Sequence, residues 1–217
     1  MEDLPWDNMS AEENVRRAEP GTGESLRRRF RLVSLGLFIL AAVQIVSGSP
    51  AFAPGAAPRR EFHHFAPYIP TPWPVVEKML EVAEVGPDDI VYDLGSGDGR
   101  IVIMAAQKFG ARAVGVEIDP RLSKESEERV KQLGLDRRVK ILQEDIFATS
   151  VRPATVVTLF LRRGMNEELR PILERELRPG TRIVAQEFDV PGWTPQKIIS
   201  TKSDDGLTYT IFLYVRP

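Results

Sequence analysis

Short apolar runs alternate with amphipathic segments over the C-terminal part of the chain. Five runs are rich in aliphatic residues and end at polar or turn residues, which is typical of buried strands. They cover residues 90–94, 113–117, 139–145, 155–161 and 182–185. Apolar residues at helical spacing predict helices near 72–85, 101–106, 119–133 and 166–177. We expect Thr71 as the N-cap of the first helix, with Pro72 at its first helical position, and Asp119 as the cap of the third. Alternation at 198–199 and 208–215 predicts a terminal antiparallel hairpin. We therefore expect a seven-stranded α/β fold, mostly parallel with an antiparallel C-terminal strand.

A glycine-rich break follows the first of these runs. Ile90-Val91-Tyr92-Asp93-Leu94 leads into Gly95-Ser96-Gly97-Asp98-Gly99, and an apolar run from Ile101 to Ala106 comes next. Glycines at this point predict a tight turn at which the backbone approaches a ligand. A strand, a glycine loop and a helix in this order are typical of nucleotide-binding α/β folds.

The spacing of the glycines differs from that of dinucleotide sites, which use G-x-G-x-x-G. Here the pattern is G-x-G-x-G, and an acid, Asp93, lies two residues before it. This resembles motif I of the class I S-adenosylmethionine (SAM) methyltransferases, whose sheet is Rossmann-like. A carboxylate such as Asp93 can attract the amino group of SAM, and bare backbone leaves room for its methionine moiety and ribose. The residues expected to contact SAM in this segment are Asp93, Gly95, Ser96, Gly97, Asp98 and Gly99.

Acids at the ends of the next two strands extend the expected SAM site. Glu117 ends the second strand, and an acid at this place in nucleotide-binding folds accepts hydrogen bonds from ribose hydroxyls. Asp145, followed by Ile146, ends the third strand and is the candidate acceptor for the adenine amino group. Glu144 is the neighbouring alternative. For either acid, a solvated loop position is the competing interpretation.

The fourth strand is largely apolar, so we expect it at the centre of the sheet. Its carboxyl end faces the transferable methyl group in the methyltransferase fold. Many amino methyltransferases of nucleobases and glutamine have Asn/Asp-Pro-Pro-Tyr/Phe at this end, whereas this chain has Leu159-Phe160-Leu161-Arg162. The difference argues against those acceptors.

The region before the domain divides into three parts. Residues 1–31 are polar, contain both signs of charge and lack periodicity, which predicts a disordered tail. Residues 32–49 are uncharged and apolar, and they just reach the roughly 17–25 residues of a membrane-spanning helix. Residues 50–60 form a Pro/Ala-rich linker, and the methyltransferase domain is expected at 61–217.

A membrane segment is the first of three interpretations of residues 32–49. A cleaved signal peptide is the second, since Arg27-Arg28-Arg29 precedes the run and Ala51-Phe52-Ala53 follows it. An organelle-targeting segment is the third. The arginines before the run would send the domain outward by the positive-inside rule. Because SAM is held in the cytosol, we nevertheless expect a membrane-associated protein with its catalytic domain on the cytoplasmic, SAM-containing side.

Composition excludes several kinds of chemistry. The net charge is −2, so there is no global basic field to collect nucleic acid. Cysteine is absent, which excludes disulfides, Cys-ligated zinc and a cysteine nucleophile. The two histidines, His63 and His64, are adjacent in sequence, and neighbouring side chains tend to point apart. We therefore expect no metal site and no nucleic-acid partner.

A more specific resemblance covers about residues 67–216 and rests on six segments in a fixed order. They are Tyr68-Ile69-Pro70-Thr71-Pro72, Asp93 to Ile103, Gly115-Val116-Glu117, Asp145-Ile146-Phe147, Pro179 to Val184, and Pro191-Gly192-Trp193. This pattern resembles the protein-lysine methyltransferases related to the mitochondrial ATP synthase c-subunit lysine methyltransferase and its archaeal broad-specificity relatives. The Pro-Thr-Pro lead-in and the late Gly-Trp loop are its more specific parts.

The resemblance implies methyl transfer from SAM to a lysine of a protein substrate, without a metal. The lysine side chain ordinarily has a pKa of about 10.4, so its amine must lose a proton before it attacks. A narrow, poorly solvated channel favours that loss. Tyr68, Thr71, Phe160 and Trp193 are the candidate channel residues, and we identify no dedicated base. A small-molecule or lipid-like acceptor and a non-catalytic SAM-binding domain are the alternatives.

Overall fold

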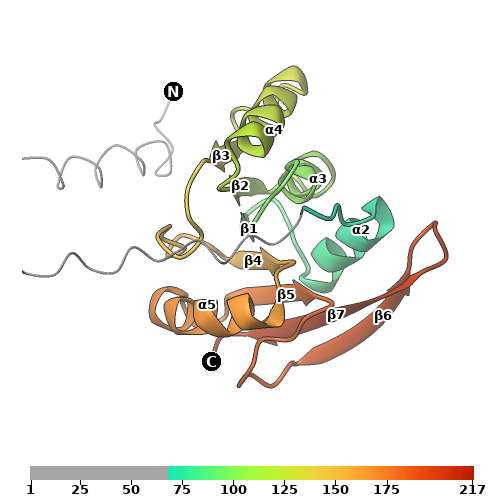
Figure 1. Cartoon of the computed structure of the whole chain (residues 1–217), viewed down its shortest axis with the longest axis vertical. Coiled ribbons are helices and arrows are strands. Elements are labelled where there is room, and N and C mark those ends of the chain that lie inside the picture. The colour runs from blue at the N-terminus through green and yellow to red at the C-terminus, as the bar shows by residue number, and fades with distance from the viewer. Residues whose placement is uncertain (1–67) are drawn as a thin grey trace, which may run out of the picture. The chain divides into compact units, whose positions relative to one another are not determined.

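The computed structural model describes residues 68–217, so the predicted tail, apolar segment and linker (1–31, 32–49 and 50–60) lie outside the described residues. The described chain forms a seven-stranded sheet in the order β3-β2-β1-β4-β5-β7-β6, shown in Figure 1. The strands are β1 Ile90–Leu94, β2 Arg112–Val116, β3 Val139–Leu142, β4 Val156–Leu159, β5 Arg182–Gln186, β6 Lys197–Lys202 and β7 Thr208–Val215. The helices are α2 Trp73–Val82, α3 Arg100–Phe109, α4 Pro120–Gln132 and α5 Arg163–Glu176.

Strands β1 to β5 are parallel, and β7 of the C-terminal hairpin runs in the opposite direction. β1 pairs in parallel with β2 and β4, β2 pairs with β3, and β4 pairs with β5. β7 is antiparallel to both β5 and β6. The predicted sheet is therefore confirmed, including the central place of the apolar strand β4.

Helices cover both faces of the sheet. Buried side chains of α2, α3 and α4 pack against one face, and those of α5 pack against the other, as Figure 1 shows. Alternate residues of the central strands contribute to the two cores. In β1, for example, Val91 belongs to the α2/α3 core and Tyr92 to the α5 core. Because the central strands are buried on both faces, they read as continuous apolar runs in the sequence.

Local sequence explains where two of the helices begin. Asp119 caps α4, since its carboxylate accepts hydrogen bonds from the backbone N–H groups of Arg121 and Leu122 at 2.8 and 3.1 Å. This confirms the predicted cap. Helix α3 begins at Arg100, directly after Gly99, which has a φ of 77°. Its apolar residues from Ile101 onward are buried against the sheet.

The structure corrects the predicted ends of several elements, and two of these corrections bear on the site. Helix α2 begins at Trp73 with Pro72 as its N-cap residue, so the prediction of Thr71 as N-cap and Pro72 as first helical residue is wrong by one position. Thr71 instead bonds to a side chain of β5, described below. Strand β3 ends at Leu142, so the acids predicted at the end of this strand lie in the following loop.

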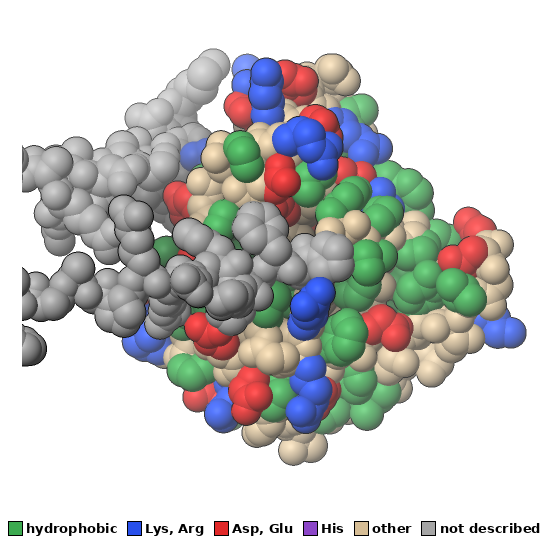
Figure 2. Space-filling view, in the orientation of Figure 1, with side chains coloured by type: hydrophobic (Ala, Val, Ile, Leu, Met, Phe, Trp, Pro, Cys, Tyr) green, Lys and Arg blue, Asp and Glu red, His purple; other side chains and the backbone are tan. Residues whose placement is uncertain are grey.

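The surface of the described domain carries both signs of charge. Figure 2 shows Lys and Arg side chains interspersed with Asp and Glu over the visible face. Helix α4 contributes several i,i+4 ion pairs, including Arg121 with Glu125 and Lys131 with Glu127. None of the helices within 68–217 has the length and apolar character needed to cross a bilayer.

Candidate active site

The glycine loop lies at the carboxyl edge of the sheet, between β1 and α3. Gly95, Gly97 and Gly99 have φ values of 83°, 54° and 77°, a region that strongly favours glycine. The backbone N–H groups of Gly95 and Ser96 donate to the carbonyl of Val116 at 2.8 and 2.9 Å. The loop therefore turns over the end of β2, which places bare backbone where open α/β sheets bind their ligands.

Asp93 is buried beside this loop. Its side chain accepts a hydrogen bond of 2.7 Å from the hydroxyl of Thr158, the residue opposite it on β4. Burial raises the pKa of Asp93 to about 7, and the charges of Glu117 and Asp98 act in the same direction. The Thr158 hydrogen bond opposes the rise by favouring the carboxylate. Asp93 can thus gain or lose a proton near neutral pH.

Glu117 directly follows β2, as the sequence predicts, and its carboxylate is buried against the glycine loop. One oxygen accepts a hydrogen bond from the N–H of Gly97 at 2.8 Å, and the other accepts from the N–H of Asp119 at 2.9 Å. Each carboxylate oxygen can accept a second hydrogen bond. The geometry therefore leaves Glu117 capable of the predicted contact with ribose hydroxyls.

Ser96 is buried in the loop, and its Oγ has no hydrogen-bond partner in the described part of the chain. A side chain on the neighbouring Gly115 of β2 would meet this oxygen at 2.7 Å, so the glycine keeps the space clear. Buried hydroxyls normally have a partner. The orphaned Ser96 hydroxyl fits a loop that binds a polar ligand.

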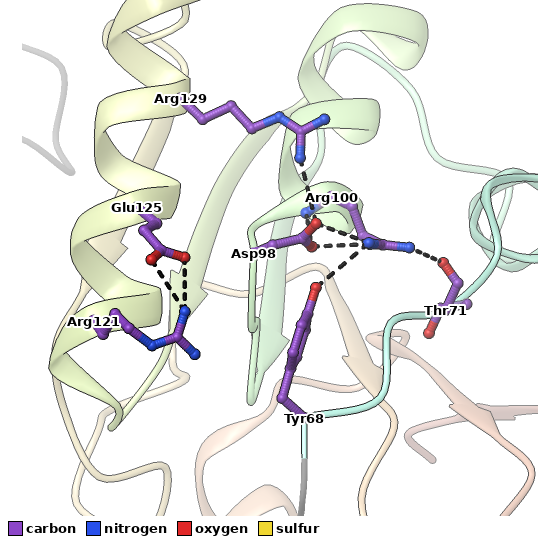
Figure 3. A network of polar contacts seen from close by, with 7 residues as sticks. All are labelled: Tyr68, Thr71, Asp98, Arg100, Arg121, Glu125 and Arg129. Atoms are coloured by element: carbon purple, nitrogen blue, oxygen red, sulfur yellow. Dashed lines mark hydrogen bonds and ion pairs between the residues drawn. The ribbon is translucent and has the colours of Figure 1, made fainter.

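Asp98 has a different environment from the one predicted. Its carboxylate accepts hydrogen bonds from Arg100 at 2.8 and 2.9 Å and from Arg129 of α4 at 3.3 Å (Figure 3). Burial alone would raise the Asp98 pKa, but the hydrogen bonds and charge of Arg100, together with Arg129, hold it below its usual value. The structure thus uses Asp98 to hold two arginines, and its contact with SAM stays a prediction.

Arg100 connects the glycine loop to the lead-in segment, which we define as residues 68–72. Its guanidinium donates to the backbone carbonyl of Thr71 at 2.6 Å and to the Tyr68 hydroxyl at 3.4 Å, as Figure 3 shows. The guanidinium groups of Arg100 and Arg129 also lie 5.4 and 5.6 Å from the ring centre of Trp73, within cation–π range. The lead-in segment is therefore held against the start of α3.

Two of the predicted channel residues lie in the lead-in segment. The ring of Tyr68 covers the glycine loop so closely that a Cβ added to Gly97 would lie 2.6 Å from it. Thr71 is buried, and its hydroxyl donates to the side-chain carbonyl of Gln186, the last residue of β5, at 2.7 Å. The segment thus reaches from the glycine loop to the end of β5.

The other two channel candidates lie in different surroundings. Phe160 directly follows β4 and is half-buried. Trp193 packs in the α5 core, where its indole N–H donates to Glu174 at 2.8 Å and its ring lies 5.7 Å from that of Tyr214. The structure therefore gives Trp193 a packing role, and its place in a channel stays a prediction.

The predicted adenine-binding residues follow β3 in a turn. Asp145 accepts a hydrogen bond from the N–H of Phe147 at 2.9 Å, and Ile146 is buried in the α5 core. Glu144 accepts a hydrogen bond from the Thr149 hydroxyl at 2.8 Å. Asp145 remains half-buried and able to accept another hydrogen bond, so adenine binding here stays a prediction.

Sequence reasoning did not single out three polar residues of this edge: Thr158, Arg100 and Gln186. Each bonds to a partner distant in the sequence. Thr158 bonds to Asp93. Arg100 and Gln186 both bond to Thr71. A threonine in an otherwise apolar central strand was the signal available for Thr158. Within 68–217, no group of three or more metal-ligating side chains is gathered in one place.

The residues at this edge fit SAM. The glycine loop offers bare backbone, Ser96 an orphaned hydroxyl, Asp93 a carboxyl for an amino group, and Glu117 a carboxylate for ribose. A seven-stranded sheet of this order with such an edge defines a class I SAM-dependent methyltransferase.

Comparison with known proteins narrows this class. The family model described as the ANTKMT methyltransferase domain matches residues 93–197. A protein-lysine N-methyltransferase of Saccharolobus islandicus is 47% identical over 150 residues, covering 69% of this chain and 92% of the relative. The chain therefore belongs to the same family as this protein-lysine N-methyltransferase, and the resemblance found in the sequence is confirmed.

Two further relatives extend the comparison. The ATP synthase c-subunit lysine N-methyltransferase of Homo sapiens is 33% identical over 143 residues, which is 66% of this chain and 60% of that protein. A crystal structure of a protein called an RNA methyltransferase, from Salinibacter ruber and in complex with S-adenosylhomocysteine, is 46% identical with a TM-score of 0.65. It covers 69% of this chain and 94% of that one. The family and the sheet agree that the protein is an enzyme that transfers a methyl group.

Proposed function

We propose that this protein transfers the methyl group of SAM to lysine side chains of protein substrates. The observation that carries the proposal is the 47% identity to a protein-lysine N-methyltransferase over 92% of that relative's length. Relatives from Homo sapiens and Xenopus laevis are named for lysine methylation as well, although this chain spans only 60% and 63% of them.

The side chains at the carboxyl edge suit a reaction that depends on positioning. SAM supplies an electrophilic methyl group when it is bound. Asp93, the glycine loop and Glu117 would hold it there. The lysine must arrive as a neutral amine, and burial lowers the pKa of an amine because the charged form loses its hydration. Correct placement of the two reactants can then contribute most of the rate enhancement.

An RNA acceptor is the second candidate, because the Salinibacter ruber relative of similar identity is called an RNA methyltransferase. Three features favour a protein acceptor. The net charge is −2, and Figure 2 shows both signs of charge mixed over the visible face rather than one basic surface. The end of β4 also lacks the Asn-Pro-Pro-Tyr type of segment used by many nucleobase methyltransferases.

Labelled SAM and matched acceptor pools test this choice. The pools are extract proteins, the same proteins with their lysines acetylated, total RNA, and extracted lipids. We expect label in the first pool and its loss after acetylation. Label that persists on acetylated protein, or that enters only RNA or lipid, would overturn the lysine proposal. Binding of SAM without transfer to any pool would favour a non-catalytic SAM-binding domain.

We further propose that residues 32–49 attach the enzyme to a membrane on its SAM-containing, cytoplasmic side, and that its acceptors include a membrane protein. The uncharged run supports attachment because a bilayer accepts such a segment.

The full chain should float with lipid vesicles, whereas a chain that begins at Arg60 should stay in solution, fold and bind SAM. Vesicle binding by the shortened chain, or its failure to fold by circular dichroism, would contradict these assignments. Digestion of the domain by protease outside intact cells would contradict the cytoplasmic placement.

A further inference from the structure

Orphaned buried polar atoms concentrate at one edge of the described sheet. Among residues 68–217, five buried side-chain atoms have no hydrogen-bond partner, and three of them belong to residues that follow or end β1, β4 or β5. These three are Ser96 Oγ, Asn166 Oδ1 and Gln186 Nε2. Folded proteins give partners to nearly all buried polar groups. Buried polar atoms without partners at the ligand-binding edge therefore indicate side chains whose hydrogen bonds are completed by a bound substrate.

Gln186 is a fully buried member of this group and the last residue of β5. In the sheet, Asp93 of β1 is opposite Thr158 of β4, which is opposite Val184 of β5. Gln186 lies two residues beyond Val184, so its side chain is on the same face as Asp93. The strand of Asp93 and the strand of Gln186 are two strand spacings apart, at roughly 4.8 Å for each spacing. Gln186 thus ends the strand next to β4, and the carboxyl end of β4 faces the transferable methyl group in this fold.

Thr71 covers Gln186 and ties it to the glycine loop. The Thr71 hydroxyl bonds to the Gln186 amide, and the Thr71 carbonyl accepts from Arg100, which follows the loop. Gln186 has 0% of its surface exposed, so neighbouring side chains must shift before a substrate reaches the free end of its amide. The residues before Thr71 in that segment, Tyr68 to Pro70, are exposed.

In either orientation of the Gln186 amide, one of its two polar atoms, the oxygen or the nitrogen, has no hydrogen-bond partner among the described residues. A threonine hydroxyl can donate to the amide oxygen or accept from the amide nitrogen, and the two ends of a glutamine amide are assigned from such contacts. With the nitrogen toward Thr71, the oxygen is free. An attacking amine has its lone pair aimed at the methyl carbon and its N–H groups aimed elsewhere. Those N–H groups need an acceptor such as this oxygen.

We propose that Gln186 accepts an N–H hydrogen bond from the incoming lysine amine and so aligns its lone pair with the methyl group of SAM. The inference rests on the proposed function. The amine has released its extra proton to water beforehand. Its nitrogen then bonds to the methyl carbon as the carbon–sulfur bond breaks, and that bond's electron pair stays on sulfur.

A purely structural role for Gln186 makes a different prediction. If its amide only fastens the lead-in segment, Thr71→Val and Gln186→Met should have the same effect, because both remove the 2.7 Å hydrogen bond. If Gln186 also contacts the acceptor amine, Gln186→Met should impair a step that Thr71→Val leaves largely intact. Gln186→Met keeps the length of the side chain and removes only its polar end.

Sinefungin allows a test that needs no acceptor. This analogue of SAM carries an ammonium group on carbon in place of the methyl sulfonium, so it presents N–H donors close to where the lysine amine would lie. Calorimetry on the full chain would give Kd values for sinefungin and for S-adenosylhomocysteine, which lacks the donor. Gln107→Met, an exposed position on α3, is the matched control.

We expect Gln186→Met to weaken sinefungin at least tenfold while S-adenosylhomocysteine changes less than twofold. Thr71→Val and Gln107→Met should shift both ligands less than threefold. Gln186→Glu retains an acceptor and should keep or tighten sinefungin binding. Equal losses for both ligands, or no loss for either, would overturn the inference. Failure of the wild-type protein to methylate lysine would overturn the proposed function instead, and it would be seen in the separate acceptor assay.

Discussion

The carboxylate of Asp93 and the hydroxyl of Thr158 share a buried hydrogen bond of 2.7 Å across neighbouring strands β1 and β4. Both side chains are almost fully enclosed. Burial raises the pKa of Asp93 to about 7, and the threonine hydroxyl limits that rise. The pair therefore places a carboxyl group that titrates near neutral pH beside the glycine loop.

SAM binding should consequently depend on pH. The ammonium group of SAM stabilises an ionised Asp93, so binding should release close to one proton at pH 6 and about half a proton at pH 7. With a free-enzyme pKa of about 7, the affinity should rise about fivefold between pH 6 and pH 7. Above that range the amino group of SAM itself begins to lose its proton, since an α-amino group has a pKa of about 7.7–8.0. Calorimetry in buffers of different ionisation enthalpy measures the proton directly. Asp93→Asn should bind more weakly and lose this dependence; an unchanged pH profile in that variant would contradict the assignment.

The same group should make the ligand-free fold less stable as pH rises. The folded state holds the Asp93 proton more tightly than the unfolded state, whose aspartate pKa is near 3.8. This contribution is therefore fully present below about pH 4, is lost as pH rises to about 7, and is constant above that. The loss is at most about 4 kcal/mol. Asp93→Asn should flatten this part of the stability curve measured by urea unfolding.

Replacing Glu117 with alanine should weaken SAM binding at least tenfold. A hydrogen bond to a charged group is worth roughly 1.5–3 kcal/mol, and the carboxylate also holds the N–H of Gly97. Glu125→Ala is the control, since Glu125 is an exposed acid on α4 paired only with Arg121 in the structure described. Thermal melts would show that both variants fold. Wild-type affinity in Glu117→Ala would show that the ribose assignment is wrong.

Arg100→Met should lower the free energy of unfolding by about 1–3 kcal/mol, because Asp98 would keep a largely buried charge with one fewer partner. It should also weaken SAM binding, since the lead-in segment would lose its bond from Arg100. Arg121→Met removes an exposed i,i+4 pair and should cost no more than about 0.5 kcal/mol. Urea unfolding of the two variants, which Figure 3 places in one view, makes the comparison. Equal losses would contradict the role given to Arg100.

Gly97→Ala should destabilise the protein more than Gly134→Ala does. Both glycines have positive φ, 54° and 67°, so both variants have similar backbone strain. An added Cβ meets the Tyr68 ring at 2.6 Å at position 97, whereas nothing lies within 4 Å of it at position 134. Adding Tyr68→Ala should therefore recover part of the loss at position 97. No recovery in the double variant, measured by thermal unfolding, would show that the ring is not the cause.

Local patterns predicted the elements that local forces decide. The apolar run at 90–94, the glycine loop and the Asp119 cap all depend on residues a few positions apart, and the structure has them where the sequence places them. Thr71 shows the limit of this reasoning. A threonine before proline is a plausible helix cap, but its hydroxyl bonds to Gln186, 115 positions away. Only the assembled sheet brings these two residues together.

The residues of the candidate site also divide into those that the sequence could predict and those that it could not. Asp93 and Glu117 could be found because strand ends with acids recur at fixed places in this kind of fold. Trp193 could not be placed, since an aromatic side chain in a glycine-containing loop suits a channel and a core equally. Its partner Glu174 lies on a helix that precedes it by nearly twenty residues. The role of Arg100 could not be predicted for a related reason, because Arg100 holds the lead-in segment, which is distant from it in the sequence.

The chemical identity of the methylated group tests the proposed lysine methylation most directly. The purified protein would be incubated with SAM labelled in its methyl group and a protein extract, and the labelled proteins would be hydrolysed to amino acids and separated. We predict that the label elutes as N-methylated lysine and disappears when Glu117→Ala replaces the wild-type protein. Label in methylarginine or methylhistidine, or in nucleotides that accompany the extract, would contradict this function.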